Sequence, residues 1–284
     1  MLNKNMRQQG GNHSTNVQGE TVHFHNGITL ADAKEIANDV FEKNMYKLTS
    51  IAETTAKERA DFLVSKMLSK IDQEAEKEKL IGKFSDPDIQ YILYTSQKSF
   101  ARNGDQDLGE VLSNLFIERL KSGEDDFKKL IMNEAIEIVP RLTNKQIEVL
   151  TLNYTMIQMK INGISSLEDY RKMFYKIINP FIPSELPAAN DCVHLDFCRV
   201  AKLDMGYRTS VSDITRIAYP EIFPQVLSEA ETLTYITKSI PEFLDLHNIW
   251  NKSMIQKIYP TLVGWVLAQL AIEKRTGIKL NIEF

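Results

Sequence analysis

Apolar side chains recur at helical spacing along the front of the chain, without a residue that would break a helix. Residues 29–81 contain no Gly and no Pro, and apolar residues return every third or fourth position. Thr29 and Asp32 have the spacing of a helix-capping box, and Gly82 follows the last apolar position. The pattern predicts one long helix over residues 28–82, about 75–80 Å in length if unbroken.

A single chain has no obvious means of covering so long an apolar stripe, so we expect this segment to associate with copies of itself. The stripe drifts from strict heptads, and a break near residues 54–55 is compatible with it. The alternatives are therefore a coiled coil and a helix partly packed on its own domain. The residues expected between copies, two of them in a preceding arm, are Val22, Phe24, Val40, Phe41, Leu48 and Ile51.

Capped helices follow one another after Gly82, which predicts an all-α fold. Residues 83–178 are predicted to form a helical bundle with short connections. Its third helix is expected to bury Phe127 and Leu130. Residues 179–187 contain three prolines, which predicts a boundary, with a second helical subdomain over residues 179–284.

Two short segments have the alternation of β-strands and lie at the two ends of the chain. Residues 1–27 are predicted to be a polar arm in which Val22 and Phe24 share one face of a short strand. Residues 278–284 alternate between apolar and polar side chains throughout. We expect this C-terminal strand either to pair with residues 21–25, in the same or another copy, or to lie on the protein's own surface as an extended tail.

Charge and hydropathy limit the classes of partner. The 284 residues carry a net charge of −4, so no nucleic-acid partner is expected. No apolar stretch follows the first basic residues, so a cytoplasmic location is expected. The longest apolar run, residues 259–272, is shorter than the roughly 20 residues of a membrane span and is predicted to be a core helix. The alternative is a helix that enters a membrane after a conformational change, which keeps a membrane as a possible target.

His23 and His25 are the candidate metal ligands. They share one face of the predicted arm strand, and in a symmetric assembly their copies would meet on the axis. An axial metal ion is one interpretation and two exposed polar side chains is the other. No other cofactor is expected.

A polar turn between two predicted helices supplies a second group of candidates. Arg102, Asp105, Asp107 and Glu134 are predicted to form a polar network, in which Asp105 caps a helix. The alternative is an anion site built on Arg102.

Cys192, His194 and Cys198 lie close together after the proline-rich break. Cys198 is one helical turn from His194, so a nucleophilic pair is conceivable, although two buried thiols explain the same residues. The sequence has none of the common nucleotide-binding or hydrolase motifs. No catalytic residue is therefore assigned.

Several motifs resemble a family of uncharacterised bacterial proteins. They are residues 11–18 (GNHSTNVQ), 27–37 (GITLADAKEIA), 86–91 (DPDIQY), 97–98 (QK), 101–108 (ARNGDQDL), 133–135 (NEA), 142–143 (LT) and 194–195 (HL). Residues 105–150 are more loosely similar to bacterial phage-defence proteins of the abortive-infection alpha type. The resemblance implies a role in defence and brings no catalytic residues with it.

The sequence thus leads to three functional hypotheses. The first is a non-enzymatic, homo-oligomeric interaction protein, a sensor or effector of phage defence, with an unidentified protein as trigger or partner. The second is a membrane-disrupting effector that exposes residues 259–272. The third is a hydrolase or nuclease with a site near Arg102 or His194.

Overall fold

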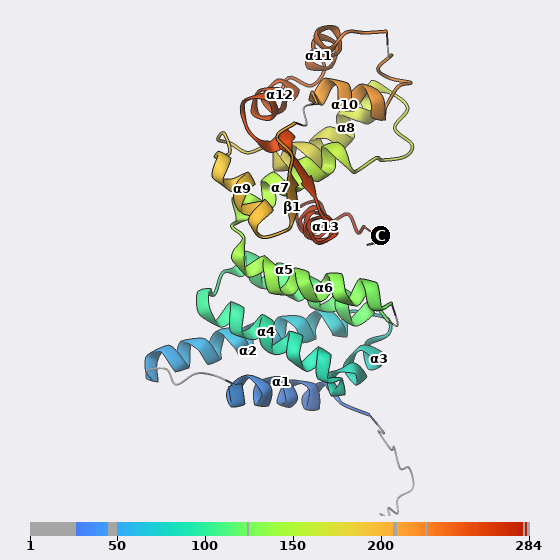
Figure 1. The fold of residues 1–284 in the computed structure, drawn as a ribbon. Helices are drawn as coiled ribbons and strands as arrows, with labels where there is room; N and C mark the ends of the chain where they lie inside the picture. The colour runs from blue at the N-terminus through green and yellow to red at the C-terminus, as the bar shows by residue number, and fades with distance from the viewer. Residues whose placement is uncertain are drawn as a thin grey trace, which may run out of the picture.

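The computed structural model describes residues 27–44, 50–123, 125–206, 209–224, 226–280 and 282, and in these the fold is all-α, as predicted. Two groups of helices are stacked on one another (Figure 1). The lower group consists of α1 (Leu30–Asn44), α2 (Ser50–Asp72), α3 (Lys77–Gly82), α4 (Pro87–Asn103), α5 (Gln106–Lys121) and α6 (Asp126–Ile138).

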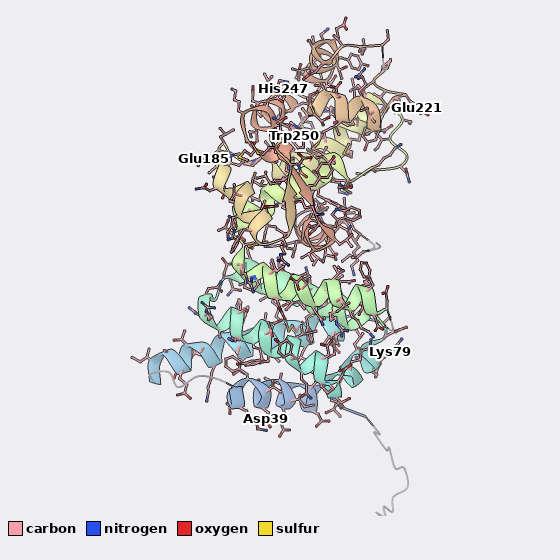
Figure 2. The ribbon with its side chains drawn as sticks, in the orientation of Figure 1. Asp39, Lys79, Glu185, Glu221, His247 and Trp250 are labelled. Carbon is pink, nitrogen blue, oxygen red and sulfur yellow. The ribbon has the colours of Figure 1, made fainter. Side chains whose placement is uncertain are left out.

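The upper group contains seven further α-helices and two short strands among the described residues. The helices are α7 (Asn144–Ile157), α8 (Leu167–Met173), α9 (Ala189–Phe197), α10 (Val211–Ala218), α11 (Glu229–Thr237), α12 (Phe243–Lys252) and α13 (Leu262–Thr276). A π-helical turn, Phe174–Ile178, continues α8. Trp250 lies inside this group (Figure 2), fully buried, and its indole Nε1 donates to the carbonyl of Thr209 at 2.7 Å.

The two groups share one hydrophobic core. α13 packs against α7 in the upper group and against α5 and α6 in the lower group. α7 contacts α9, α10 and the short strand β2 (Ile258–Pro260) as well as α13. The predicted boundary at residue 179 therefore falls inside the upper group, because α7 and α8 precede the proline-rich segment yet belong with the helices that follow it.

The front segment is not the single long helix that its unbroken pattern predicts. It forms α1, α2 and α3, with residues 45–49 outside the described residues, and both α1 and α2 pack on α4 and on each other. Figure 1 shows α1 and α2 lying side by side. The apolar stripe is long because it serves several contacts within one chain. Helical spacing cannot distinguish those contacts from a contact between copies.

The predicted contact residues fall into different environments as a result. Phe41 is 4% exposed and packs against Ala56 and Ala60 of its own chain. Val40 is half-buried, whereas Ile51 is 81% exposed. Val22, Phe24 and Leu48 lie outside the residues whose side chains are described.

The short strands also differ from the prediction. The two strands of the described residues, β1 (Ala201–Leu203) and β2 (Ile258–Pro260), pair antiparallel with Ala201 opposite Pro260. Residues 278–280 and 282, here called the tail, are not in a strand. Ile282 is buried, and its carbonyl accepts a hydrogen bond from Lys128 Nζ at 3.1 Å. Ile282 of the tail thus packs on its own protein, as the second alternative expected. Residues 21–25 lie outside the described residues, so pairing with them stays a prediction.

α13 is the buried core helix predicted from residues 259–272. Val266, Leu267, Leu270 and Ile272 are each at most 1% exposed. No helix among the described residues has both the length and the apolar character needed to cross a bilayer.

Candidate functional site

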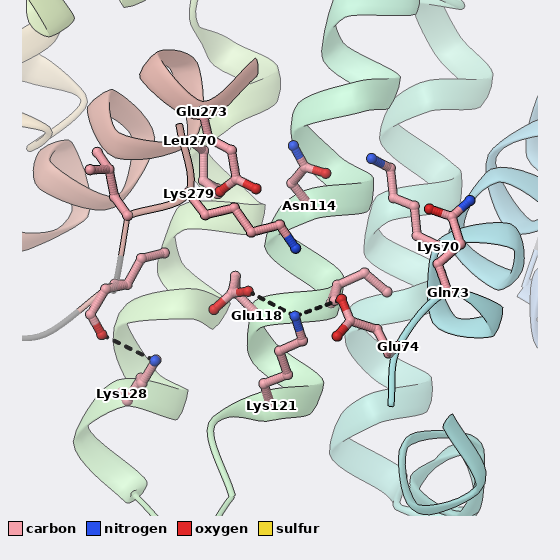
Figure 3. A pocket seen from close by; sticks show the side chains of 13 residues that line it. Lys70, Gln73, Glu74, Asn114, Glu118, Lys121, Lys128, Leu270, Glu273 and Lys279 are labelled. Atoms are coloured by element: carbon pink, nitrogen blue, oxygen red, sulfur yellow. Dashed lines mark hydrogen bonds and ion pairs between the residues drawn. The ribbon is translucent and has the colours of Figure 1, made fainter. Parts of the chain in front are cut away.

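A cleft lined by charged side chains lies between the two groups of helices and is the candidate functional site. Its volume is about 720 Å³, and its walls come from α2, α5, α6, α13 and the tail (Figure 3). A second hollow of about 510 Å³ adjoins it and shares Lys70, Asn114, Glu273 and Lys279 with it. We call the two hollows together the charged cleft. Residues from distant parts of the sequence line it, so no local motif could have revealed it.

Ion pairs hold most of the lysines of the charged cleft. Lys66 and Lys70 of α2 each lie 2.6 Å from a carboxylate oxygen of Glu110. Lys121 Nζ lies 2.7 Å from Glu74 and 3.5 Å from Glu118, as the dashed lines of Figure 3 show. The side chains in these pairs are about a quarter to a third exposed. Each pair therefore adds little to the free energy of folding and mainly fixes the positions of the lysines in the wall.

Two carboxyl groups of the charged cleft have pKa values displaced in opposite directions. Burial alone would raise the pKa of Glu110, but the ammonium groups of Lys66 and Lys70 lower it below its usual value of 4.5. Burial raises the pKa of Glu273 above 4.5, and the nearby Lys279 only partly opposes this. Among the described residues Glu273 makes no ion pair, so its carboxylate is poorly compensated.

The opposite displacements predict opposite effects of removing each charge. A raised folded-state pKa means that ionised Glu273 disfavours the fold, so Glu273→Gln should raise the melting temperature at pH 7. That gain should vanish below about pH 4, where the carboxyl is protonated in both states. Glu110→Gln should lower the melting temperature at pH 7, and this loss should fade as the pH falls through the lowered pKa. Thermal unfolding of both variants across pH 3–8 tests the signs, and equal signs would contradict the assignment.

The predicted polar network at the turn after α4 assembles only in part. Asp105 caps α5 as predicted, since its carboxylate accepts hydrogen bonds from the backbone N–H groups of Asp107 and Leu108. Gly104 before it is left-handed, with φ of 67°. Asp107 pairs with Lys274 of α13 and accepts from Asn144 Nδ2 at 3.2 Å. It therefore ties the lower group to the upper one.

Arg102 and Glu134 do not join that network. Both side chains are exposed, and no described contact links either of them to Asp105 or Asp107. The backbone carbonyl of Arg102, not its side chain, accepts a hydrogen bond from Arg59 at 3.3 Å. Most members of the predicted network are close in sequence, but Arg102 lies in the last turn of α4 with its side chain exposed to solvent.

A buried polar network, which the sequence analysis missed, lies between α4, α5 and α6. Arg119 of α5 is 4% exposed, donates to Asn133 Oδ1 at 2.8 Å and pairs with Asp88. Asn133 Nδ2 in turn donates to Asp88 at 3.3 Å, so α4, α5 and α6 meet at one cluster. The available signal was an arginine in register with the buried Leu112, Leu115 and Phe116 of the same helix.

His194 and Cys198 come together as their spacing suggested, with a third partner. Gln146 Oε1 accepts from the Thr143 backbone N–H at 3.1 Å and lies 3.1 Å from His194 Nδ1. Because that oxygen only accepts, Nδ1 is the donor to it, and Nε2 lies 3.6 Å from Cys198 Sγ. Cys198 is only 5% exposed, and burial raises the pKa of its thiol. Both properties disfavour a nucleophile.

The remaining thiol and the histidines of the arm add no described site. Cys192 is buried, and burial raises its pKa to about 12. No group of three or more potential metal ligands occurs in the part of the chain that the structure describes. His23 and His25 lie outside that part, so the axial metal ion stays a prediction.

The comparisons with known proteins identify a family without assigning a function. No curated protein and no solved structure matches the chain. The family model of an uncharacterised protein family matches residues 27–237, which is well over half of the chain. The matched range runs from α1 through α11 and so covers the lower group and most of the upper one. The chain is therefore a member of this uncharacterised family.

Proposed function

We propose that this protein is a non-enzymatic interaction protein that works as a homo-oligomer. The observation that carries the proposal is an exposed apolar pair on α6. Phe127 is 53% and Leu130 is 65% exposed, one helical turn apart, although the pattern of the helix assigns both to a core. A second copy of the chain could pack against the exposed faces of these two side chains.

Other described side chains agree with an interaction role. Ile51 at the start of α2 is 81% exposed, and α9 exposes Val193 and Phe197 one turn apart. By contrast, the most promising nucleophile, Cys198, is enclosed and has a raised thiol pKa. The geometry therefore supports contacts between proteins better than covalent chemistry.

The proposed cellular role is in bacterial phage defence, as a sensor or an effector. It rests on the similarity of residues 105–150 to abortive-infection alpha proteins. In the structure this stretch comprises α5, α6 and the first half of α7. The exposed pair on α6 lies inside it, so the proposed contact between copies and the defence resemblance concern the same part of the chain.

Light scattering on the full chain at micromolar concentration tests the assembly. We expect a specific oligomer between a dimer and a hexamer. Leu130→Asp should shift the mass toward that of one chain, because a buried carboxylate costs several kcal/mol per ion at an apolar contact. Deletion of residues 1–27 should also weaken the oligomer, because Val22 and Phe24 of the arm are expected at the contact between copies; an unchanged mass would refute that role of the arm.

Val226→Asp is the matched control for Leu130→Asp. Val226 is 89% exposed, so the change adds the same charge at another apolar surface position and should leave the mass unchanged. Circular dichroism verifies that both variants fold. A full chain that is monodisperse as a single copy would refute the proposed assembly. An oligomer insensitive to Leu130→Asp would remove α6 from the contact.

A further inference from the structure

The charged cleft has a property that self-association does not explain, namely an excess of positive charge on its tail side. Lys279 extends from the tail across the cleft toward α5 (Figure 3). No carboxylate among the described residues forms an ion pair with it. Lys128 donates to the neutral carbonyl of Ile282 rather than to an acid. Two ammonium groups on this side of the charged cleft thus make no ion pair within the described residues, although Glu273 lies near Lys279.

The opposite wall is arranged differently and holds its charges in fixed positions. Glu110 holds Lys66 and Lys70, while Glu74 and Glu118 hold Lys121. The amide of Asn114 lies between these two clusters, and Figure 3 shows it facing the open space near Lys279. Lysines that are already positioned lose less side-chain entropy when a ligand binds.

These observations indicate the class of ligand that fits the charged cleft. We propose that the charged cleft binds a small hydrophilic ligand with at least one phosphate or carboxylate group. Lys279 and Lys128 are the primary contacts for the anionic group, because both ammonium charges lack an ion-pair partner among the described residues. Glu118 and Glu273 face the same space and can accept hydrogen bonds from hydroxyl or amino groups of the ligand.

Size and lining support a small ligand over a macromolecule. The main hollow, at about 720 Å³, lies in the range of roughly 300–1,000 Å³ that is usual for small-molecule sites. Its lining is mostly polar, unlike that of a groove for an apolar helix. This assignment goes beyond the proposed function and does not depend on the oligomeric state.

Isothermal titration of the full chain with two probes, ribose 5-phosphate and citrate, tests the assignment. Buffers are matched in ionic strength, and spermidine serves as the cationic comparison. At least one anion should bind with sub-millimolar affinity, and the one that binds identifies phosphate or carboxylate as the recognised group. Lys279→Gln should weaken that binding about tenfold, the usual loss for one charge-assisted hydrogen bond.

Lys238→Gln provides the matched control, since Lys238 is an exposed lysine at the end of α11 and away from the cleft. It should leave the affinity unchanged, and both variants should keep the melting temperature of the parent chain without ligand. Failure of both anions to bind, tighter binding of spermidine, or an equal loss in the Lys238 variant would each overturn the proposal. The mass in solution is measured separately, so a failed ligand test leaves the homo-oligomer proposal standing.

Discussion

Gly264→Ala is expected to destabilise the fold more than any other single methyl addition at a described glycine. A Cβ atom at this position would lie 2.0 Å from the carbonyl oxygen of Val200, far inside van der Waals contact. That oxygen cannot move freely, because it accepts a hydrogen bond from Thr261 N–H at 2.9 Å. Val200 also leads directly into β1, which pairs with β2. The first turn of α13 therefore has to separate from the strand pair.

The free energy of unfolding should fall by about 3 kcal/mol, at the upper end of the usual cost of overpacking. Urea denaturation measures the loss. Gly82→Ala is the matched control, since its Cβ meets nothing within 4 Å and its φ of −54° suits alanine. That variant should gain about 0.4–1 kcal/mol from the lower entropy of its unfolded chain. A Gly264→Ala protein as stable as the parent would show that α13 does not approach Val200 this closely.

Local signals in the sequence were sufficient for the fold class and for many helix ends. Thr29 and Asp32 form the expected reciprocal hydrogen bonds, with Thr29 N–H donating to Asp32 at 2.8 Å. Thr143 and Gln146 form another capping box, at the start of α7. Each of these features involves residues three apart, so the information needed to predict it lies within one turn of helix.

The arrangement of the helices depended on information that is not local. The residues between α1 and α2 include neither Gly nor Pro, so no helix-breaking residue marked where α1 ends and α2 begins. Gln97 of α4 is completely buried and donates to the carbonyl of Ala37 at 3.1 Å, a contact across 60 residues. Such a pairing is specified by the packed core as a whole. The tail shows the same limit, because alternation predicts an extended segment but not its partner.

The candidate site was less predictable than the fold for the same reason. The charged cleft brings together Lys70, Lys121 and Lys279, which lie in three separate segments of the sequence. Each is an ordinary lysine in its local context. Conversely, the sequence grouped Arg102, Asp105, Asp107 and Glu134 because most of them are neighbours in sequence. In the structure Asp105 instead caps α5, and Asp107 forms an ion pair with Lys274 of another helix.

Arg119→Ala is expected to have the second-largest effect, because it removes the centre of the buried network between α4, α5 and α6. The guanidinium of Arg119 donates to Asn133 and Ser122 and pairs with Asp88. Its loss leaves the Asn133 oxygen without that donor and opens a cavity where the side chain was. The free energy of unfolding should fall by about 2–3 kcal/mol. Arg102→Ala, at an exposed position in the last turn of α4, should change the free energy of unfolding by less than about 0.5 kcal/mol.

A double-mutant cycle separates the ion pair from the packing. Asp88→Ala alone leaves the Arg119 charge buried with only neutral partners, which costs folding free energy. In Arg119→Ala the remaining Asp88 carboxylate is solvated instead, because its side chain is 45% exposed. The double variant Asp88→Ala with Arg119→Ala should therefore be more stable than the sum of the two single losses predicts, by about 1 kcal/mol or more. Additive losses would mean that Arg119 stabilises the three helices through packing and its bonds to Asn133 and Ser122, without energetic coupling to Asp88.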